Sequence, residues 1–348
     1  MQRQVRTVLL FSAVLGSLAG VYGGPLRAAT PAFVNVRDYG ALCNDPGGTV
    51  RGADDTAAFQ AAFNAATGGR VQVPPGKAGT CLGSTQHCDD QVTPCSNSSQ
   101  CPTLLCRVTN TLALPTNVIL EGASPMASKI WLQSSSGIPV VLIGSYTASS
   151  PVDTEGGGLK DIGIWGNGIN VANQVGVLVT RATEAKLENV MVRNVETAFK
   201  LDGGPAGNFT GDTTLIHPMT SGVKYGLYIT SSGGLVTDTR CCTGGEFYGN
   251  PQRTGEGIHA DRMTTSQLGA FSVEGFNYGV RLMLYSSVNV IFGGRAESIG
   301  SGNGTQSYVC DGAGVVHTMF YWPLDADVGS NLFGVTNLNG AACTTNSN

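Results

Sequence analysis

One short unit recurs five times in the middle of the chain, and it constrains the fold more than any other feature. Each copy is a Gly or Ala followed by alternating residues: GVLV at 176, AFKL at 198, GLYI at 226, GIHA at 257 and GVRL at 279. The intervals of 22, 28, 31 and 22 residues fit a solenoid of short strands with loops inserted into particular turns. No helical pattern lies between the copies, which argues against a sheet with crossover helices.

The composition favours an all-β chain. Glycine occurs 49 times and charged residues make up only 13%, whereas helix surfaces are normally rich in Lys and Glu. Gly and Asn supply the positive φ angles that tight turns between strands need. The net charge is −4 and no Lys/Arg run occurs, so nothing indicates a nucleic-acid partner.

The N-terminus is typical of an export signal. Arg3 and Arg6 precede the apolar run TVLLFSAVLGSLAGVYG, which is shorter than a membrane-spanning helix needs and contains several glycines. We expect a signal peptide over residues 1–29, a single domain over 30–348, and a secreted or periplasmic protein without membrane contact after cleavage. A retained membrane anchor is the alternative.

Ten cysteines agree with export, because an even number in an exported chain favours disulfides. The vicinal residues Cys241 and Cys242 could form a strained redox pair with each other, but we expect each to bond elsewhere, with Cys310 and Cys343 as candidates. Zinc is the competing interpretation, but there is no CxxC motif and His87 is the only histidine in the cysteine cluster. The predicted disulfide residues are Cys43, Cys81, Cys88, Cys95, Cys101, Cys106, Cys241, Cys242, Cys310 and Cys343.

The segment after the signal has a strong local pattern. FVNVRDYG alternates like a strand, Asp54-Asp55-Thr56 supplies N-cap side chains, and Gly68-Gly69 ends a helix. The helix presents one apolar face at i, i+3, i+4 and i+7 spacing, formed by Phe59, Ala62, Phe63 and Ala66. VQVPPG follows as another strand and turn.

This order of elements resembles the N-terminal cap of pectate-lyase-like β-helix proteins, which include polysaccharide lyases, glycoside hydrolases, uronan epimerases and tailspike depolymerases. LALPTNVILEGAS at 112–124 is similar to the family's next segment. The resemblance implies a right-handed parallel β-helix with a cap over 33–76 that contains an α-helix, and coils over 107–348. The Cys-rich stretch over 77–106 interrupts the family pattern and is too polar for a coil, so we expect a disulfide-stapled surface insertion there, joined to the cap through Cys43. The resemblance also implies a structural rather than a catalytic role for the paired aspartates. The matching cap residues are Asp38, Gly40, Ala41, Asp54, Asp55, Thr56, Pro74, Pro75 and Gly76.

Alternation along the five units predicts which side chains face out. The interior positions are Val177, Val179, Phe199, Leu201, Leu227, Ile229, Ile258, Ala260, Val280 and Leu282. The first outward column contains Leu178, Lys200, Tyr228, His259 and Arg281. The second outward column contains Thr180, Asp202, Thr230, Asp261 and Met283.

These columns carry the candidate site. We expect Lys200 and Arg281 to bind carboxylate or sulfate groups and Tyr228 to pack on a sugar ring. The candidate catalytic residues are His259, which moves protons near neutral pH, and Asp202 with Asp261. These two aspartates would lie two rungs, about 9.6 Å, apart, near the upper limit for an inverting pair. The alternative is a set of ordinary solvent-facing polar residues.

The reaction itself stays open, because fold does not imply function. The GHG and RIK elements of polygalacturonase-type hydrolases, the WIDH-like string of pectate lyases and the DPHE-type string of mannuronan epimerases are absent. One hypothesis is a lyase or glycoside hydrolase that cleaves an acidic polysaccharide. The other is a non-catalytic polysaccharide-binding or surface-adhesion module. No cofactor is required, although Ca²⁺ would be compatible, and the tailspike-like resemblance allows a homotrimer.

Seven further carboxylates are expected in or near coil turns, namely Glu188, Asp212, Asp238, Glu246, Glu256, Glu274 and Glu297.

Overall fold

A computed structural model describes most of the chain after the N-terminal segment. The described residues are 33–45, 52–76, 81–82, 87–88, 104–145, 154–297, 299, 307–321, 324–325 and 335–346. The chain divides into the units Met1–Thr30 and Pro31–Asn348, and every element below belongs to the second. The predicted signal peptide lies outside the described residues. Within them, no helix has the length and apolar character needed to cross a membrane.

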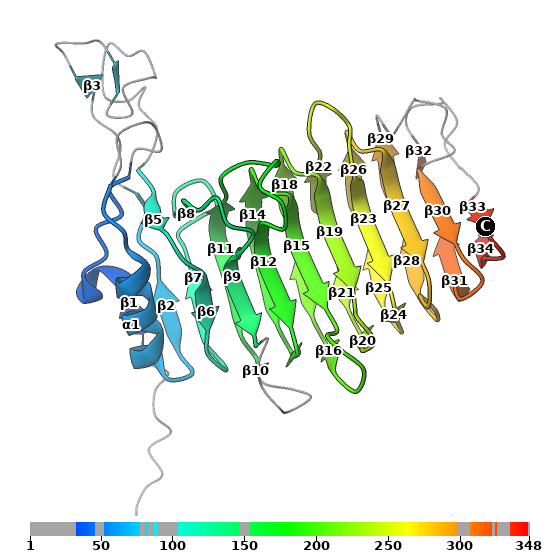
Figure 1. Cartoon of the computed structure of the whole chain (residues 1–348), viewed down its shortest axis with the longest axis horizontal. Helices are drawn as coiled ribbons and strands as arrows, with labels where there is room; N and C mark the ends of the chain where they lie inside the picture. The colour runs from blue at the N-terminus through cyan, green and yellow to red at the C-terminus, as the bar shows by residue number, and fades with distance from the viewer. Residues whose placement is uncertain are drawn as a thin grey trace, which may run out of the picture. The chain divides into compact units, whose positions relative to one another are not determined.

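One nine-stranded parallel sheet, which we call the ladder sheet, contains all five repeat units. Its strands succeed one another along the solenoid in chain order, as Figure 1 shows from cyan to red. They are β6 (Leu112–Leu114), β9 (Pro139–Gly144), β12 (Val175–Thr180), β15 (Thr197–Asp202), β19 (Tyr225–Thr230), β23 (Glu256–Asp261), β27 (Tyr278–Met283), β30 (Tyr308–Asp311) and β33 (Thr336–Leu338).

Two further rows of parallel strands complete each coil, and the long strands β11 (Gly158–Trp165) and β14 (Lys186–Arg193) run through both. The first row also contains β1 (Phe33–Asn35), β2 (Arg70–Gln72), β7 (Ile119–Glu121), β17 (Thr214–Ile216), β21 (Arg240–Cys241), β25 (Gln267–Gly269), β28 (Val290–Phe292), β31 (Val316–Tyr321) and β34 (Ala342–Asn346). The second row also contains β5 (Cys106–Val108), β8 (Lys129–Leu132), β18 (Met219–Ser221), β22 (Gly245–Tyr248), β26 (Phe271–Glu274), β29 (Arg295–Glu297) and β32 (Leu324–Asp325).

Short strands occupy the corner after the ladder sheet, and a small hairpin lies in the insertion. The corner strands are β10 (Thr154–Glu155), β13 (Ala182–Thr183), β16 (Phe209–Gly211), β20 (Leu235–Thr237) and β24 (Met263–Thr264). The antiparallel hairpin pairs β3 (Cys81–Leu82) with β4 (His87–Cys88).

The bend between the two rows uses one residue of positive φ in successive coils. Asp161, Asn189, His217 and Ala270 adopt this conformation, with φ between 50° and 52°. Asn189 Nδ2 donates to Asp161 Oδ1 at 2.6 Å, and Asn189 Oδ1 lies 3.2 Å from His217 Nδ1. Gly and Asn therefore supply only part of the left-handed positions, because hydrogen bonds between stacked coils also hold other residues there.

The predicted interior is confirmed. All ten side chains assigned to it are fully buried, because alternate residues of each ladder strand point to the same side of the sheet. They pack inside the coil with apolar residues of the other two rows, among them Val190, Val192, Phe247 and Val273.

The cap forms largely as predicted, with two differences. Helix α1 (Thr56–Ala66) buries the expected apolar face and packs on β1, β2 and β6. However, FVNVRDYG is not one strand: β1 ends at Asn35, whose side chain accepts a hydrogen bond from Arg37 N and starts the 3-10 helix η1 (Val36–Tyr39).

Asp55 precedes α1 but does not cap it with its side chain, which is the second difference. Its carboxylate accepts hydrogen bonds from the backbone N–H groups of Leu42 and Cys43 at 2.7 and 3.1 Å. Asp54 instead accepts from Thr56 N at 3.1 Å. The carboxylate of Asp55 points away from the helix because the buried N–H group of Cys43 needs an acceptor.

The disulfides correct one prediction and support another. Cys43 bonds to Cys106, which joins the cap to the end of the insertion. Cys310 bonds to Cys343, and Cys241 bonds to Cys242, so the expected cross-links from the vicinal pair were wrong. Strand β21, which contains Cys241, lies four rungs or about 19 Å from β34, too far for a disulfide. The side chains of Cys81, Cys88, Cys95 and Cys101 lie outside the described residues.

Candidate functional site

The two outward columns have the predicted register. Parallel pairing aligns Leu178, Lys200, Tyr228, His259 and Arg281 on consecutive strands from β12 to β27. In the second column, Thr180 aligns with Asp202 and Asp202 with Thr230, while Asp261 aligns with Met283. Leu178 and Thr180 are nevertheless buried. The polar part of the ladder therefore lies on β15, β19, β23 and β27.

A third outward column, which alternation did not predict, lies three residues before the first. It consists of Thr197, Tyr225, Glu256 and Tyr278, which also align rung by rung. Tyr225 and Tyr228 make an edge-to-face ring contact at 5.0 Å. The side chains at i and i+3 therefore share the outer face of the ladder sheet.

The small residue of each repeat unit separates the third column from the first. A Cβ atom on Gly226 would lie 2.4 Å from the carbonyl oxygen of Gly257 on the next rung. A Cβ atom on Gly257 would lie 2.0 Å from a methyl group of Val273. Both distances are far below normal contact, so glycine is a packing requirement at these two rungs of the coil.

Aromatic rings form the centre of the site. Tyr228 stacks on His259 with centroids 4.3 Å apart and planes 7° from parallel. A hollow of 360 Å³ adjoins this stack and is lined by Asn173, Val175, Glu196, Thr197, Lys200, Tyr225, Tyr228 and Thr230. A flat ring beside an open hollow is the type of surface on which a sugar ring packs.

Burial and neighbouring acidic groups both act on the Tyr228 phenol. Burial raises its pKa, and the charges of Tyr225, Glu256, Asp261 and Asp202 raise it further. Two of these acidic residues, Asp202 and Asp261, are the ones that the sequence placed on this face.

Asp261 is the acid with the most unusual environment. Burial raises the pKa of its carboxyl group, and the charges of His259 and Arg262 only partly oppose this. Its Oδ1 atom is buried and has no hydrogen-bond partner in the described part of the chain. A carboxyl group in such a position favours its protonated form.

Asp202 differs from Asp261 in its partners. Its Oδ1 accepts a hydrogen bond from Gly204 N at 2.8 Å, and its Oδ2 lies 3.4 Å from Lys200 Nζ. Two strand spacings, from β15 through β19 to β23, separate the two aspartates, or about 9.6 Å along the ladder.

Glu256 and Asp311 hold the two remaining basic groups of the ladder. Glu256 Oε2 lies 2.5 Å from His259 Nδ1, and its Oε1 accepts from Arg281 Nη1 at 3.1 Å. Arg281 Nη2 donates to Asp311 Oδ2 at 2.7 Å, and this bond lowers the pKa of Asp311. The guanidinium group also lies over Tyr278, at 4.7 Å from the ring centroid.

The sequence interpretation missed Glu256, Tyr225, Tyr278 and Asp311 as members of the site. Glu256 begins strand β23 next to a coil turn, and Glu188, Glu246, Glu274 and Glu297 also lie in strands near turns, which agrees with the expected positions of these carboxylates. The signal was present, since Tyr225, Glu256 and Tyr278 each directly precede the glycine of a repeat unit. Strict alternation does not predict that these residues face outward, because the pleat is irregular at the glycine that follows each of them.

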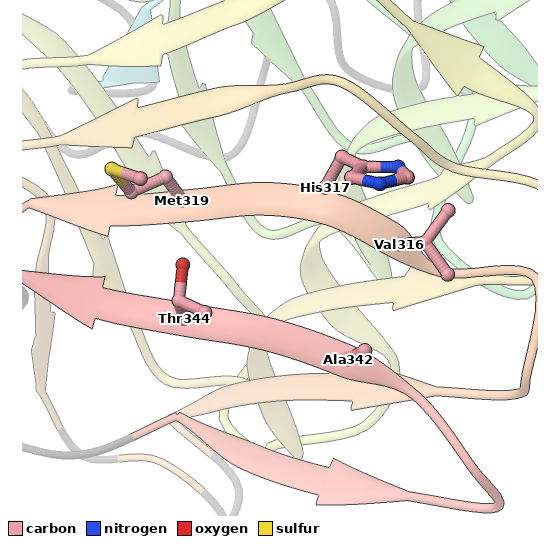
Figure 2. A pocket seen from close by; sticks show the side chains of 5 residues that line it. All are labelled: Val316, His317, Met319, Ala342 and Thr344. Atoms are coloured by element: carbon pink, nitrogen blue, oxygen red, sulfur yellow. The ribbon is translucent and has the colours of Figure 1, made fainter.

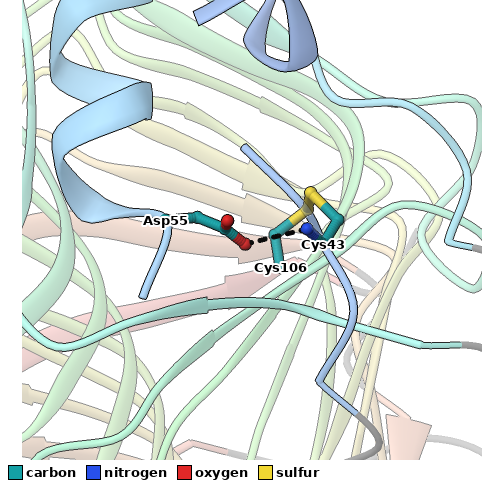
Figure 3. Close-up of side chains that lie close together, drawn as sticks. All are labelled: Cys43, Asp55 and Cys106. Atoms are coloured by element: carbon teal, nitrogen blue, oxygen red, sulfur yellow. Dashed lines mark hydrogen bonds between the residues drawn. A yellow bond between two sulfur atoms is a disulfide. The ribbon is translucent and has the colours of Figure 1, made fainter. Parts of the chain in front are cut away.

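Two other local features do not form comparable sites. A hollow of about 440 Å³ lies at β31 and β34, and none of its lining side chains is a carboxylate. Figure 2 shows these side chains, which are Val316, His317, Met319, Ala342 and Thr344. Figure 3 shows Cys43, Asp55 and Cys106 close together. Both sulfur atoms are consumed by their disulfide, so this cluster is structural rather than metal-binding. The compatibility of the chain with Ca²⁺ stays an expectation from the sequence.

Comparison with known proteins identifies the fold. No family model and no curated protein sequence matches the chain. The structure of the enzymatically active domain of tailspike protein 2 from bacteriophage CBA120 is similar, with a TM-score of 0.53 and 14% identity over 91% of this chain. The match spans 47% of that domain, and 42% of the full-length tailspike, so this chain corresponds to less than half of either.

A second similar structure has about the same length as this chain. DFA-IIIase from Arthrobacter chlorophenolicus A6, in complex with GF2, has a TM-score of 0.52 and 11% identity over 91% of this chain and 93% of its own. Identities this low establish the fold alone. Together with the parallel strand order, these two similarities show that the chain has a right-handed parallel β-helix fold.

Proposed function

We propose that the chain is a carbohydrate-active protein that binds a glycan across β15–β27 of the ladder sheet and hydrolyses it. The observation that carries this proposal is Asp261: its carboxyl group has a raised pKa and an unpartnered buried oxygen, beside the stacked rings of Tyr228 and His259. A general acid for glycosidic cleavage must hold a proton near neutral pH, and burial is the usual means.

Asp202 is the complementary carboxylate in this proposal. Its ion pair with Lys200 and its bond to Gly204 N hold the carboxylate of Asp202 in place as the general base. A separation of about 9.6 Å between Asp202 and Asp261 leaves room for a water molecule, which corresponds to an inverting hydrolase. In this arrangement the sugar lies between the two carboxylates and His259 contacts it.

The charges on the ladder favour hydrolysis over elimination. Lys200 is paired with Asp202, and Arg281 is paired with both Glu256 and Asp311. A lyase needs an available cation to neutralise the uronate carboxylate, and a polyanion needs several. We therefore place a neutral or sparsely charged glycan ahead of the acidic polysaccharide that the sequence predicted, with Tyr225 and Tyr228 as its packing surface.

Export fits this proposal, because the Cys43–Cys106 and Cys310–Cys343 disulfides require an oxidising compartment. The protein would then bind its polysaccharide outside the cytosol. A homotrimer stays a prediction.

The test is incubation of the purified protein with a panel of neutral and uronic-acid glycans. We expect new reducing ends from a neutral glycan, without the ultraviolet absorbance of unsaturated uronides. The Asp261→Asn variant should lose at least about 100-fold in rate while it retains glycan binding. Asp238→Asn is the matched control, since Asp238 is an exposed turn residue with φ 53°, a conformation that Asn tolerates.

Three results would overturn the proposal. Ultraviolet absorbance would identify a lyase, and unchanged hydrolysis by Asp261→Asn would exclude this proton donor. Binding of a glycan that is never cleaved would identify the chain as a non-catalytic binding module.

A further inference from the structure

We infer that Glu256 is a positioning residue that fixes the tautomer and the orientation of His259, so that His259 Nε2 accepts a hydrogen bond from a glycan hydroxyl group. The identity of that hydroxyl partner rests on the proposed function. The fixation of the imidazole does not, because it follows from contacts within the chain.

Glu256 is almost enclosed by the protein, with 7% of its surface exposed, and His259 is 8% exposed. A carboxylate at such a depth is stable only when its oxygens are bound. Both are: Oε2 lies 2.5 Å from His259 Nδ1, and Oε1 accepts from Arg281 Nη1 at 3.1 Å.

These contacts determine which imidazole nitrogen carries the hydrogen. The guanidinium group of Arg281 can only donate, so Glu256 Oε1 is the acceptor of that bond, and a carboxylate likewise accepts at its second oxygen. His259 Nδ1 must therefore be the donor. In the neutral ring Nε2 is then the unprotonated nitrogen, available as an acceptor.

Further contacts immobilise the ring and its carboxylate. Tyr228 covers one face of the imidazole in a nearly parallel stack. Asp311 binds the second amino group of Arg281 and is itself bound by Asn339 Nδ2 at 2.5 Å. The hydrogen bonds from Arg281 to Glu256, from Arg281 to Asp311 and from Asn339 to Asp311 thus connect β23, β27 and β30 with the residue after β33, and they restrain Glu256.

Nε2 is the part of the ring that remains available. It has no hydrogen-bond partner among the described residues, and it is not enclosed from solvent. The ring is thus presented with its acceptor nitrogen outward, at the rung next to Tyr228. A sugar ring packed on that surface offers hydroxyl groups as donors.

The first experiment uses no glycan. Long-range ¹H–¹⁵N spectra of the intact protein at alkaline pH, where imidazole is neutral, report the tautomer of each of the four histidines, and His259→Gln assigns the signal. We expect wild-type His259 in the Nδ1–H form. The Nε2–H form in the wild type would overturn the inference.

Variants then test the role of the carboxylate. Glu256→Ala should shift His259 toward the Nε2–H form, while Glu256→Gln, which keeps a neutral acceptor, should restore part of the Nδ1–H population. Glu246→Ala is the control, because Glu246 is exposed on β22 in another sheet row. If Glu256→Ala does not fold, the wild-type and Glu256→Gln spectra still decide the question. Identical His259 spectra in the wild type and a folded Glu256→Ala would also overturn it.

Activity supplies the second readout. Where a glycan is cleaved, Glu256→Ala should lower kcat/KM by about 10- to 100-fold and Glu256→Gln by less. Equal kcat/KM for the wild type and Glu256→Ala would contradict the positioning role. An Nδ1–H tautomer in a protein that cleaves no glycan would leave the fixation of His259 standing and refute the proposed hydrolase, so the two failures are distinguishable.

Discussion

The Gly257→Ala variant tests whether the small-residue column is a packing requirement of the coil. A Cβ atom at Gly257 would lie 2.0 Å from Val273 Cγ1 and 2.8 Å from Gly279 O. Normal contacts between such atoms are about 3.5–4.0 Å, so the Val273 methyl group must move by roughly 1.5–2 Å. Overpacking of this kind costs about 1–3 kcal/mol, and we expect that loss in the free energy of unfolding.

The double variant with Val273→Ala separates steric overlap from other effects. Val273→Ala alone removes two buried methyl groups and should cost about 2 kcal/mol. Because the same substitution makes room for the new Cβ atom, the double variant should cost about 1 kcal/mol less than the sum of the single ones.

Urea unfolding monitored by circular dichroism measures all three variants. Ala198→Gly is the control, since Ala198 occupies the same column on β15 and is fully buried. It should cost only about 0.5–1 kcal/mol through backbone entropy. Wild-type stability of Gly257→Ala, within about 0.5 kcal/mol, or strict additivity in the double variant would refute the packing argument.

Three other predictions concern Asp261 of the ladder sheet, Asp54 of the cap and the Cys43–Cys106 disulfide of the cap. Burial raises the folded-state pKa of Asp261, so the stability that its protonated form contributes is lost as the pH rises through that pKa. The melting temperature of Asp261→Asn should therefore be higher than that of the wild type at neutral pH and equal to it in acid. Burial opposes ionisation of Asp54, but hydrogen bonds from Thr109 and Thr56 outweigh burial and lower the pKa of its carboxyl group. Asp54→Asn should therefore have a lower melting temperature than the wild type at neutral pH, and the difference should disappear as the pH falls through the folded-state pKa. Replacing both Cys43 and Cys106 by Ser opens a bridge of sequence separation 63 and should cost about 4 kcal/mol by denaturant unfolding, and an unchanged midpoint would contradict it.

Local patterns predicted the fold to an unusual extent. The alternation in five repeat units specified the interior side chains and the rung-by-rung register from β12 to β27, and both agree with the structure. This was feasible because in a parallel solenoid the next rung is the next copy of the unit, so strand pairing follows the order of the chain. The helix of the cap was readable for a similar reason, since its apolar face depends on spacing within one turn.

The site was predicted only in part, because its chemistry depends on contacts between coils. Strict alternation located His259 and Asp261 but hid Glu256, which faces outward only because the pleat is irregular at Gly257. The sequence also presented Arg281 as a group free to bind substrate, whereas Glu256 and Asp311 engage it.

The amino-acid sequence by itself determined the class of fold, the cap helix and the two alternating columns, because each depends on periodicity over a few residues. The tertiary structure alone decided which ladder charges are paired, which carboxyl group is buried without a partner and which cysteines bond. Those properties depend on how the coils stack and on which way side chains turn, as in the bond from Arg281 to Asp311 on the next rung and the disulfide from Cys43 to Cys106 across the insertion.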